Sequence, residues 1–129
     1  MRQEVYSGRL KLNGEEHEET LRAANNYAVS LNGLKRFDEA KSLMRKTVPV
    51  ARRVLGENHD LTLRMRKIYS KALYKDPDAT LDDLREAVAT LEDIEPIARR
   101  VLGGAHPLAA SIERDLQNAR AAFDASEKA

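Results

Sequence analysis

The 129-residue sequence lacks cysteine and tryptophan and contains only two phenylalanines. Without cysteine, the chain can form no disulfide, no thiolate zinc site and no cysteine nucleophile, and it fits a reducing compartment. No apolar run approaches the ~20 residues that a helix needs to cross a bilayer. Residues 1–5 include an acidic residue and no apolar signal core, so no export signal is visible. We therefore expect a cytoplasmic protein without a membrane segment.

The chain also lacks a marked excess of either charge, since it has 22 basic and 21 acidic residues and a formal net charge of +1. This balance predicts neither a nucleic acid nor an anionic membrane as partner. Charged residues make up 33% of the chain and aromatic residues 5%. Such a composition favours an all-α chain whose core is built from Leu, Ala, Val and Ile. The length allows one domain or a short repeat array.

An internal repeat is present. Residues 51–59 (ARRVLGENH) recur 47 positions later as residues 98–106 (ARRVLGGAH), and Pro49 and Pro96 share the same register. A fainter copy, residues 14–17, matches the Gly-x-x-His ending 42 positions before His59. All three histidines therefore occupy one equivalent position, which indicates a duplicated structural unit.

Each unit is expected to be a helical hairpin, because apolar residues recur at spacings of three and four. The helices are predicted over about 20–31, 37–55, 60–74, 81–102 and 107–125, with a further helix before Asn13. In the helix predicted over 81–102, Val101 belongs to the row of apolar side chains that is expected to point inward. Thr80 with Asp83 resembles a capping box. Pro49 and Pro96 would kink their helices and set the curvature of the array.

The sequence thus predicts a single repeat domain over 1–129 with four parts. These are a trailing helix of a truncated repeat (1–13), a first full repeat (14–59), a second full repeat (60–106) and a C-terminal capping helix (107–129). The last helix is polar on much of its surface, as a solenoid end must be to stay soluble.

A hairpin of about 42 residues ending in Val-Leu-Gly-x-x-His resembles the tetratricopeptide repeat of the kinesin light chain type. The family pattern Asn-Asn-Leu-Ala appears as Asn25-Asn26-Tyr27-Ala28, and Gly-Lys-Tyr-x-x-Ala appears as residues 35–40 with the turn glycine moved to Gly33. The resemblance is strong over residues 14–59 and weak beyond Pro107. The long coiled coil of kinesin light chain itself is absent.

The resemblance implies a right-handed superhelical α-solenoid whose first helices line a concave groove for a peptide segment of a partner protein. The positions that would face this groove are Arg22, Asn25, Asn26, Val29, Asn32, Arg64, Lys67 and Lys71, with Tyr74 as a further candidate. Because several are basic and none is acidic, an acidic or carboxylate-bearing segment is the natural ligand class. The plainer reading is that these basic residues form an ordinary solvated helix surface.

Two other interactions compete with this function. Exposed solenoid ends could pair two copies in a homodimer. The repeated pairs Arg52-Arg53 and Arg99-Arg100 could contact nucleic acid, although aromatic platforms and a basic excess are missing.

Catalytic and metal-binding motifs are not found. His17-Glu18 lacks the second histidine of a zinc motif, the loop after Asp76 lacks the glycine and glutamate of a calcium loop, and no phosphate-binding or nucleophile motif occurs. We therefore expect no enzyme activity, no metal and no cofactor.

Overall fold

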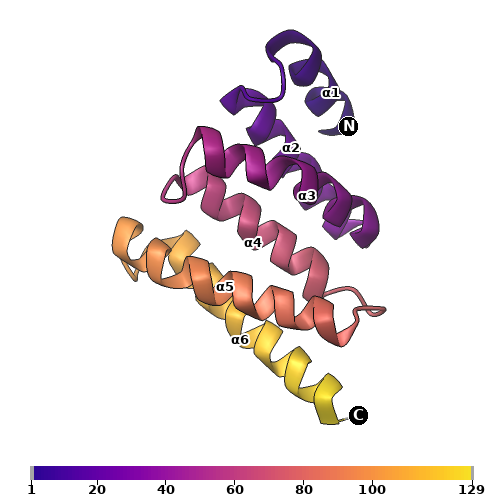
Figure 1. Cartoon of the computed structure of the whole chain (residues 1–129), viewed down its shortest axis with the longest axis vertical. Coiled ribbons are helices and arrows are strands. Elements are labelled where there is room, and N and C mark those ends of the chain that lie inside the picture. Colours follow the sequence, from indigo (N-terminus) through magenta and orange to yellow (C-terminus); the bar gives the residue numbers. More distant parts are fainter. Residues whose placement is uncertain (1, 129) are drawn as a thin grey trace.

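The computed structural model describes residues 2–128 and folds this part of the chain into six helices without a strand. The helices are α1 (Arg2–Asn13), α2 (Glu18–Gly33), α3 (Phe37–Val54), α4 (Asp60–Tyr74), α5 (Leu81–Leu102) and α6 (Pro107–Lys128). They follow one another from one end of the molecule to the other, with the two termini at opposite ends (Figure 1). This is an α-solenoid of helix hairpins, which confirms the predicted fold class.

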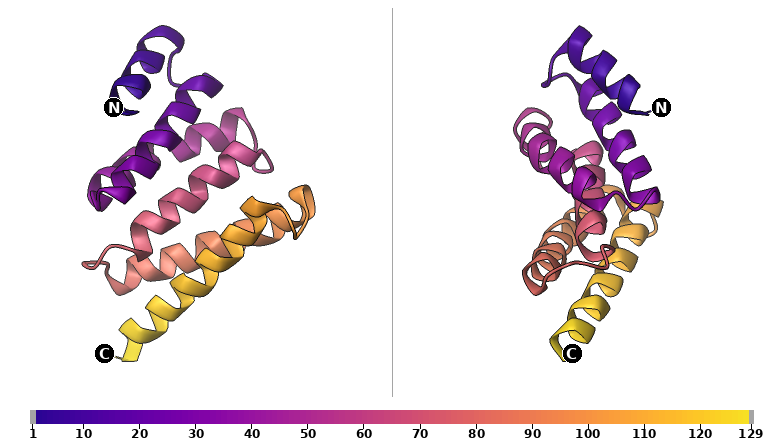
Figure 2. Two further views of the ribbon diagram at one scale, coloured as in Figure 1. Left: turned by 180° about the vertical axis from the view of Figure 1, so that it is seen from behind. Right: turned by 90° about the vertical axis from the view of Figure 1, so that its right-hand side faces the viewer.

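The helices form two layers. Each helix packs on the next in sequence, and in addition α2 contacts α4 and α4 contacts α6. The layer of α2, α4 and α6 therefore lies against the layer of α3 and α5, as the side view shows (Figure 2, right). Helix α4 touches four other helices, and its largest apolar side chains, which include Leu61, Leu63, Met65 and Leu73, are almost completely buried. The core of the solenoid is centred on α4.

A glycine ends each hairpin. Gly14, Gly56 and Gly103 have φ angles of 80°, 94° and 91°. Residues with a Cβ rarely adopt this left-handed region, so glycine lets the chain leave one helix and turn toward the next without strain. The three glycines share one position of the repeat, and all three junctions consequently lie along the same edge of the molecule (Figure 1).

A histidine begins the helix after each of these glycines. The Nδ1 atoms of His17, His59 and His106 accept hydrogen bonds of 3.1, 3.1 and 3.0 Å from the backbone N–H groups of Glu19, Leu61 and Leu108. These N–H groups have no partner inside their own helix, so each imidazole acts as an N-terminal cap. The shared register of the three histidines therefore reflects one structural role, the start of α2, α4 and α6.

The longer loop between α4 and α5 ties the two hairpins together. Thr80 and Asp83 form the predicted capping box at the start of α5. Earlier in the loop, the Asp76 carboxylate lies 3.0 Å from the ammonium of Lys41, a buried side chain of α3. Burial alone would raise the pKa of Asp76, but the hydrogen bond from the N–H of Asp78 and the charge of Lys41 outweigh it and lower the pKa.

Some details differ from the prediction. Val101 was expected to point inward, but its side chain is 45% exposed. Its repeat equivalent, Val54, is similarly exposed, at 41%. Both valines lie in the last turn before a junction glycine. The apolar pattern of the sequence therefore extends beyond the part of the helix that packs against its neighbours. Helix α6 also runs to Lys128 rather than to about residue 125.

Two parts of the sequence analysis stay predictions. Pro49 and Pro96 lie inside α3 and α5, and their effect on the curvature of the array is untested. The division of the chain into two full repeats between partial ones is likewise untested, and positions 1 and 129 lie outside the described residues.

The capping role predicts the effect of replacing His59. His59→Ala leaves the N–H of Leu61 without its acceptor and should lower the free energy of unfolding by about 1 kcal/mol, measured by urea denaturation. His59→Asp supplies a better cap and a charge that suits the helix N-terminus, so it should restore or exceed the original stability. Equal losses in both variants would show that the imidazole acts through packing rather than through the cap.

Candidate functional site

A groove runs along the inner faces of α2, α4 and α6. It consists of two adjoining depressions of about 400 and 260 Å³, which share Val29 and Ile68. The first is also lined by Asn25, Asn26, Arg64, Lys67, Pro107, Leu108 and Ser111. The second is also lined by Asn32, Gly33, Phe37, Lys71 and Lys75. The helices of one layer thus form a continuous surface with an apolar floor and polar walls.

Seven of the eight residues that the sequence assigns to the groove line these depressions. They share one face of each helix because Asn25, Val29 and Asn32 on α2, and Arg64, Lys67 and Lys71 on α4, follow helical spacing. Arg22 does not line either depression. Its guanidinium lies 2.8 Å from Glu18 on the exposed surface one turn earlier in α2.

The groove asparagines have different surroundings. Asn32 donates a hydrogen bond of 3.2 Å from Nδ2 to the backbone carbonyl of Ile68 and so ties α2 to α4. Asn25 is only 8% exposed, and among the described residues its Oδ1 finds no hydrogen-bond partner. A buried amide oxygen without a partner carries a desolvation cost. Oδ1 of Asn32 is likewise buried without a hydrogen-bond partner among the described residues, so both asparagines place an unused acceptor beneath the surface of the groove.

A single carboxylate from α6 holds the basic residues of α4. The side chain of Asp115 is only 6% exposed and lies 3.1 Å from the ammonium of Lys67 and 3.9 Å from that of Lys71. The hydroxyl of Tyr74 donates a hydrogen bond of 2.8 Å to the same carboxylate. Tyr74 is therefore buried against α6, and the suggestion that it faces the groove is wrong. Burial together with the neighbouring charge of Asp115 raises the pKa of Tyr74.

Positive charge exceeds negative charge at this point. Burial lowers the pKa of Lys71; the carboxylate of Asp115 opposes this shift, and the nearby charges of Lys67 and Arg114 add to it. Lys67 and Lys71 thus share one buried anion. The side chain of Lys71 is 33% exposed, whereas that of Lys67 is 12% exposed, so Lys71 is the more accessible of the two lysines.

Helix α6 also contributes to the groove, which the sequence pattern did not predict. Applying the 47-residue offset to Arg64, Lys67 and Lys71 leads to Ser111, Arg114 and Asn118, and Ser111 does line the groove. The same offset leads from Ile68 to Asp115. The repeat register could therefore have indicated these positions, but not that an aspartate there would pair with lysines of α4.

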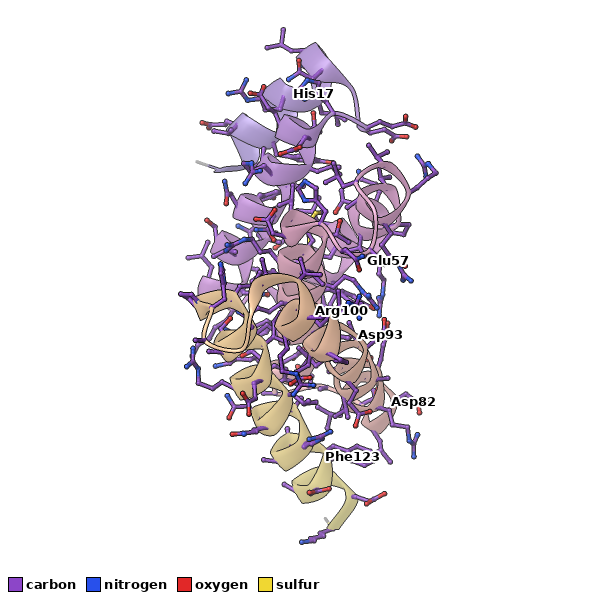
Figure 3. The ribbon with its side chains drawn as sticks, turned by 90° about the vertical axis from the view of Figure 1, so that its left-hand side faces the viewer. His17, Glu57, Asp82, Asp93, Arg100 and Phe123 are labelled. Carbon is purple, nitrogen blue, oxygen red and sulfur yellow. The ribbon has the colours of Figure 1, made fainter. Side chains whose placement is uncertain are left out.

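The repeated arginine pairs are engaged within the protein. Arg52 forms hydrogen bonds with Glu57 at the end of α3, and Arg53 reaches Glu16 at 3.0 Å. Arg100 donates to Asn58 at 3.4 Å, and Figure 3 shows it on the same flank as Glu57 and Asp93. Neighbouring acceptors thus compete with any phosphate for these guanidinium groups.

Other kinds of site were sought over the same part of the chain. Between residues 2 and 128 the structure holds no group of three or more histidine, cysteine, aspartate or glutamate side chains that could bind a metal ion. None of the helices in this range is long and apolar enough to cross a membrane.

The Asp115 cluster predicts a large loss of stability for Asp115→Asn, because this change leaves Lys67 and Lys71 without their shared buried counter-charge. The free energy of unfolding should fall by roughly 3 kcal/mol in urea denaturation. Glu92→Gln is the control, since the ion pair of Glu92 with Arg120, at 2.8 Å, also attaches α6 to a neighbouring helix, here α5, but is half exposed. Its loss should stay below about 1 kcal/mol. Similar losses in the two variants would contradict the account.

Comparison with known families bears on the first complete hairpin. Residues 20–60 match the family model of the tetratricopeptide repeat, a span that covers nearly all of α2, all of α3 and the first residue of α4. Neither the curated proteins nor the solved structures include a significant match. Residues 20–60 are therefore similar to a tetratricopeptide repeat, a helical unit that generally serves protein–protein interaction as a non-enzymatic scaffold.

Proposed function

We propose that this chain is a non-catalytic scaffold that binds a peptide segment of a partner protein in the groove of α2, α4 and α6. The tetratricopeptide repeat over residues 20–60 supports an interaction role. The groove supports the binding of an extended segment, because its two depressions follow one another along three helices.

The charge of the groove favours an acidic peptide. Arg64, Lys67, Lys71 and Lys75 are among the described residues that line the two depressions, whereas no acidic residue among them does, and this excess is the observation that carries the proposal. A carboxylate of the ligand that approaches Lys71 would supply the counter-charge that Asp115, at 3.9 Å, gives only weakly. Arg64 is also available to a ligand, because its pairing with Asp60 is exposed and long at 3.5 Å.

Uncharged groups of the groove add selectivity. Val29 and Ile68 offer an apolar floor to a side chain of the ligand. The fitting ligand is therefore an extended acidic segment that also carries an apolar side chain.

The subtype and the location are proposed from the sequence alone. The period of about 42 residues and the recurring Gly-x-x-His ending favour the kinesin light chain type of the repeat. The absence of cysteine favours a reducing compartment such as the cytoplasm.

Self-association is a second candidate function, and one observation favours it. An apolar cleft, lined by Tyr27, Leu31 and the exposed Leu34 among others, lies at the C-terminal end of α2 and adjoins the groove at Gly33.

The acidic-ligand proposal predicts the outcome of a peptide-array experiment. Twelve-residue probe peptides of constant apolar content and graded acidic content should bind in proportion to their negative charge, and binding should weaken as salt is added. Lys71→Glu should lower the affinity for the acidic peptides by about tenfold or more, because it replaces an attraction by a repulsion.

Lys46→Glu is the matched control, since Lys46 is an exposed lysine of α3 that does not line the groove. This variant should bind as the original chain does. Equal binding of acidic, neutral and basic peptides, or equal losses in the two variants, would contradict the proposal.

A further inference from the structure

The groove contains two lysines that compete for one carboxylate. Lys67 and Lys71 lie four residues apart on α4, so their side chains share one face of the helix. The ammonium of Lys67 lies 3.1 Å from Oδ2 of Asp115, and that of Lys71 lies 3.9 Å from Oδ1. The Oδ1 atom also accepts the hydrogen bond of the Tyr74 hydroxyl. Lys71 is therefore the less firmly paired of the two lysines.

The surroundings of Lys71 disfavour its charged form. Burial lowers the pKa of Lys71, and the positive charges of Lys67 and Arg114 lower it further. The negative charge of Asp115 opposes these effects without cancelling them. At any pH below the usual lysine range, a larger fraction of this amine is consequently neutral than of an ordinary surface lysine. The neutral amine is the nucleophilic form of a lysine.

Lys71 also borders a space that a small molecule can enter. It lines the depression of about 260 Å³ together with the apolar residues Val29, Phe37 and Ile68. Helices α2 and α3 contribute only uncharged residues to the described lining of this depression. The side chain of Lys71 is 33% exposed, whereas that of Lys67 is only 12% exposed. A weakly paired amine thus stands at the edge of an accessible apolar surface.

We propose that Lys71 is an acylation site that reacts with small acyl thioesters. The neutral amine adds to the carbonyl carbon of the thioester and forms a carbon–nitrogen bond. The carbon–sulfur bond then breaks, and its electron pair leaves with the sulfur. The surplus proton of the nitrogen passes to the departing thiolate or to water. The products are an amide at Nζ of Lys71 and a free thiol.

The environment of Lys71 suits the acylated side chain better than the ammonium. The amide carries no charge, so burial and the neighbouring cations no longer oppose it. The acyl chain contacts the apolar lining of the depression and is removed from water there. Acylation also leaves the carboxylate of Asp115 to Lys67 alone, so no buried charge loses its partner.

Acylation would also regulate ligand binding, a consequence that rests on the proposed function. It removes the charge of one of the four basic residues that line the two depressions. An acidic peptide loses its attraction to Lys71, and the acyl chain occupies part of the second depression. Acyl transfer thus makes the groove less basic and more apolar.

Reaction of the whole chain with S-acetyl-N-acetylcysteamine, a small acetyl thioester, tests the proposal. Mass spectrometry of proteolytic fragments gives the acetylation rate of each lysine from neutral to mildly alkaline pH. Lys75 is one internal control, since it lines the same depression and is more exposed, and Lys46 outside the groove is a second. At neutral pH Lys71 should react about threefold or more faster than either, because more of its amine is neutral.

Lys67→Gln separates the electrostatic effect from accessibility. This change removes the neighbouring positive charge and leaves Asp115 to Lys71 alone. It should therefore raise the pKa of Lys71 and shift the pH profile of its acetylation to higher pH. The rate at neutral pH should fall, although a smaller neighbour leaves Lys71 no less accessible. Circular dichroism verifies the fold, and Arg114→Gln, which should shift the profile in the same direction, replaces this variant if helix content falls.

Two results would overturn the proposal. The first is acetylation of Lys71 no faster than that of Lys75 and Lys46, and the second is a faster reaction of Lys71 in Lys67→Gln. Peptide binding separates these failures from a failure of the proposed function. If the chain acetylated at Lys71 bound acidic peptides as the unmodified chain does, the groove charge would not set the ligand preference, while the acylation site would stand.

Discussion

The burial of α4 is the constraint on which the rest of the structure depends. A single helical hairpin cannot bury its apolar face alone, so it gains a core only by stacking on its neighbours. Helix α4 contacts α2, α3, α5 and α6, and this leaves one strip of its surface outside the core. Arg64, Lys67 and Lys71 lie on that strip. The groove is therefore the part of the central helix that packing leaves open, bordered by the two helices of the same layer.

The electrostatics of the groove follow from how α6 is attached to this central helix. Asp115 is buried at the α4–α6 contact, and it pairs with Lys67 while accepting a hydrogen bond from Tyr74. One carboxylate thus fastens the last helix and also orients the cations of the groove. Because breaking such a buried pair leaves unpaired charge behind, stability and the proposed ligand preference depend on the same residues. The charges around Lys71 therefore serve the packing of α6 on α4 as well as the proposed binding of a ligand.

The sequence predicted the parts of the fold that depend on local and repeated patterns. Periodicity located six helices, the capping box of Thr80 and Asp83 marked the start of α5, and the register of the repeat placed the three histidines at one equivalent position. Contacts between distant residues were not predictable in the same way. The pairing of Lys41 with Asp76, the place of Tyr74 against Asp115 and the exposure of Val101 depend on which helix faces which, and periodicity describes only the faces of a single helix.

The central claim is that ligands bind to the inner layer of the solenoid. Amide chemical-shift mapping by NMR, with an acidic peptide selected from the array added to the labelled chain, tests it most directly. The account predicts that the largest shifts fall on the inner faces of α2 and α4 and around Ser111 of α6, while α3 and the cleft near Leu34 change little. Shifts concentrated on α3 and α5, or in the cleft near Leu34, would contradict it.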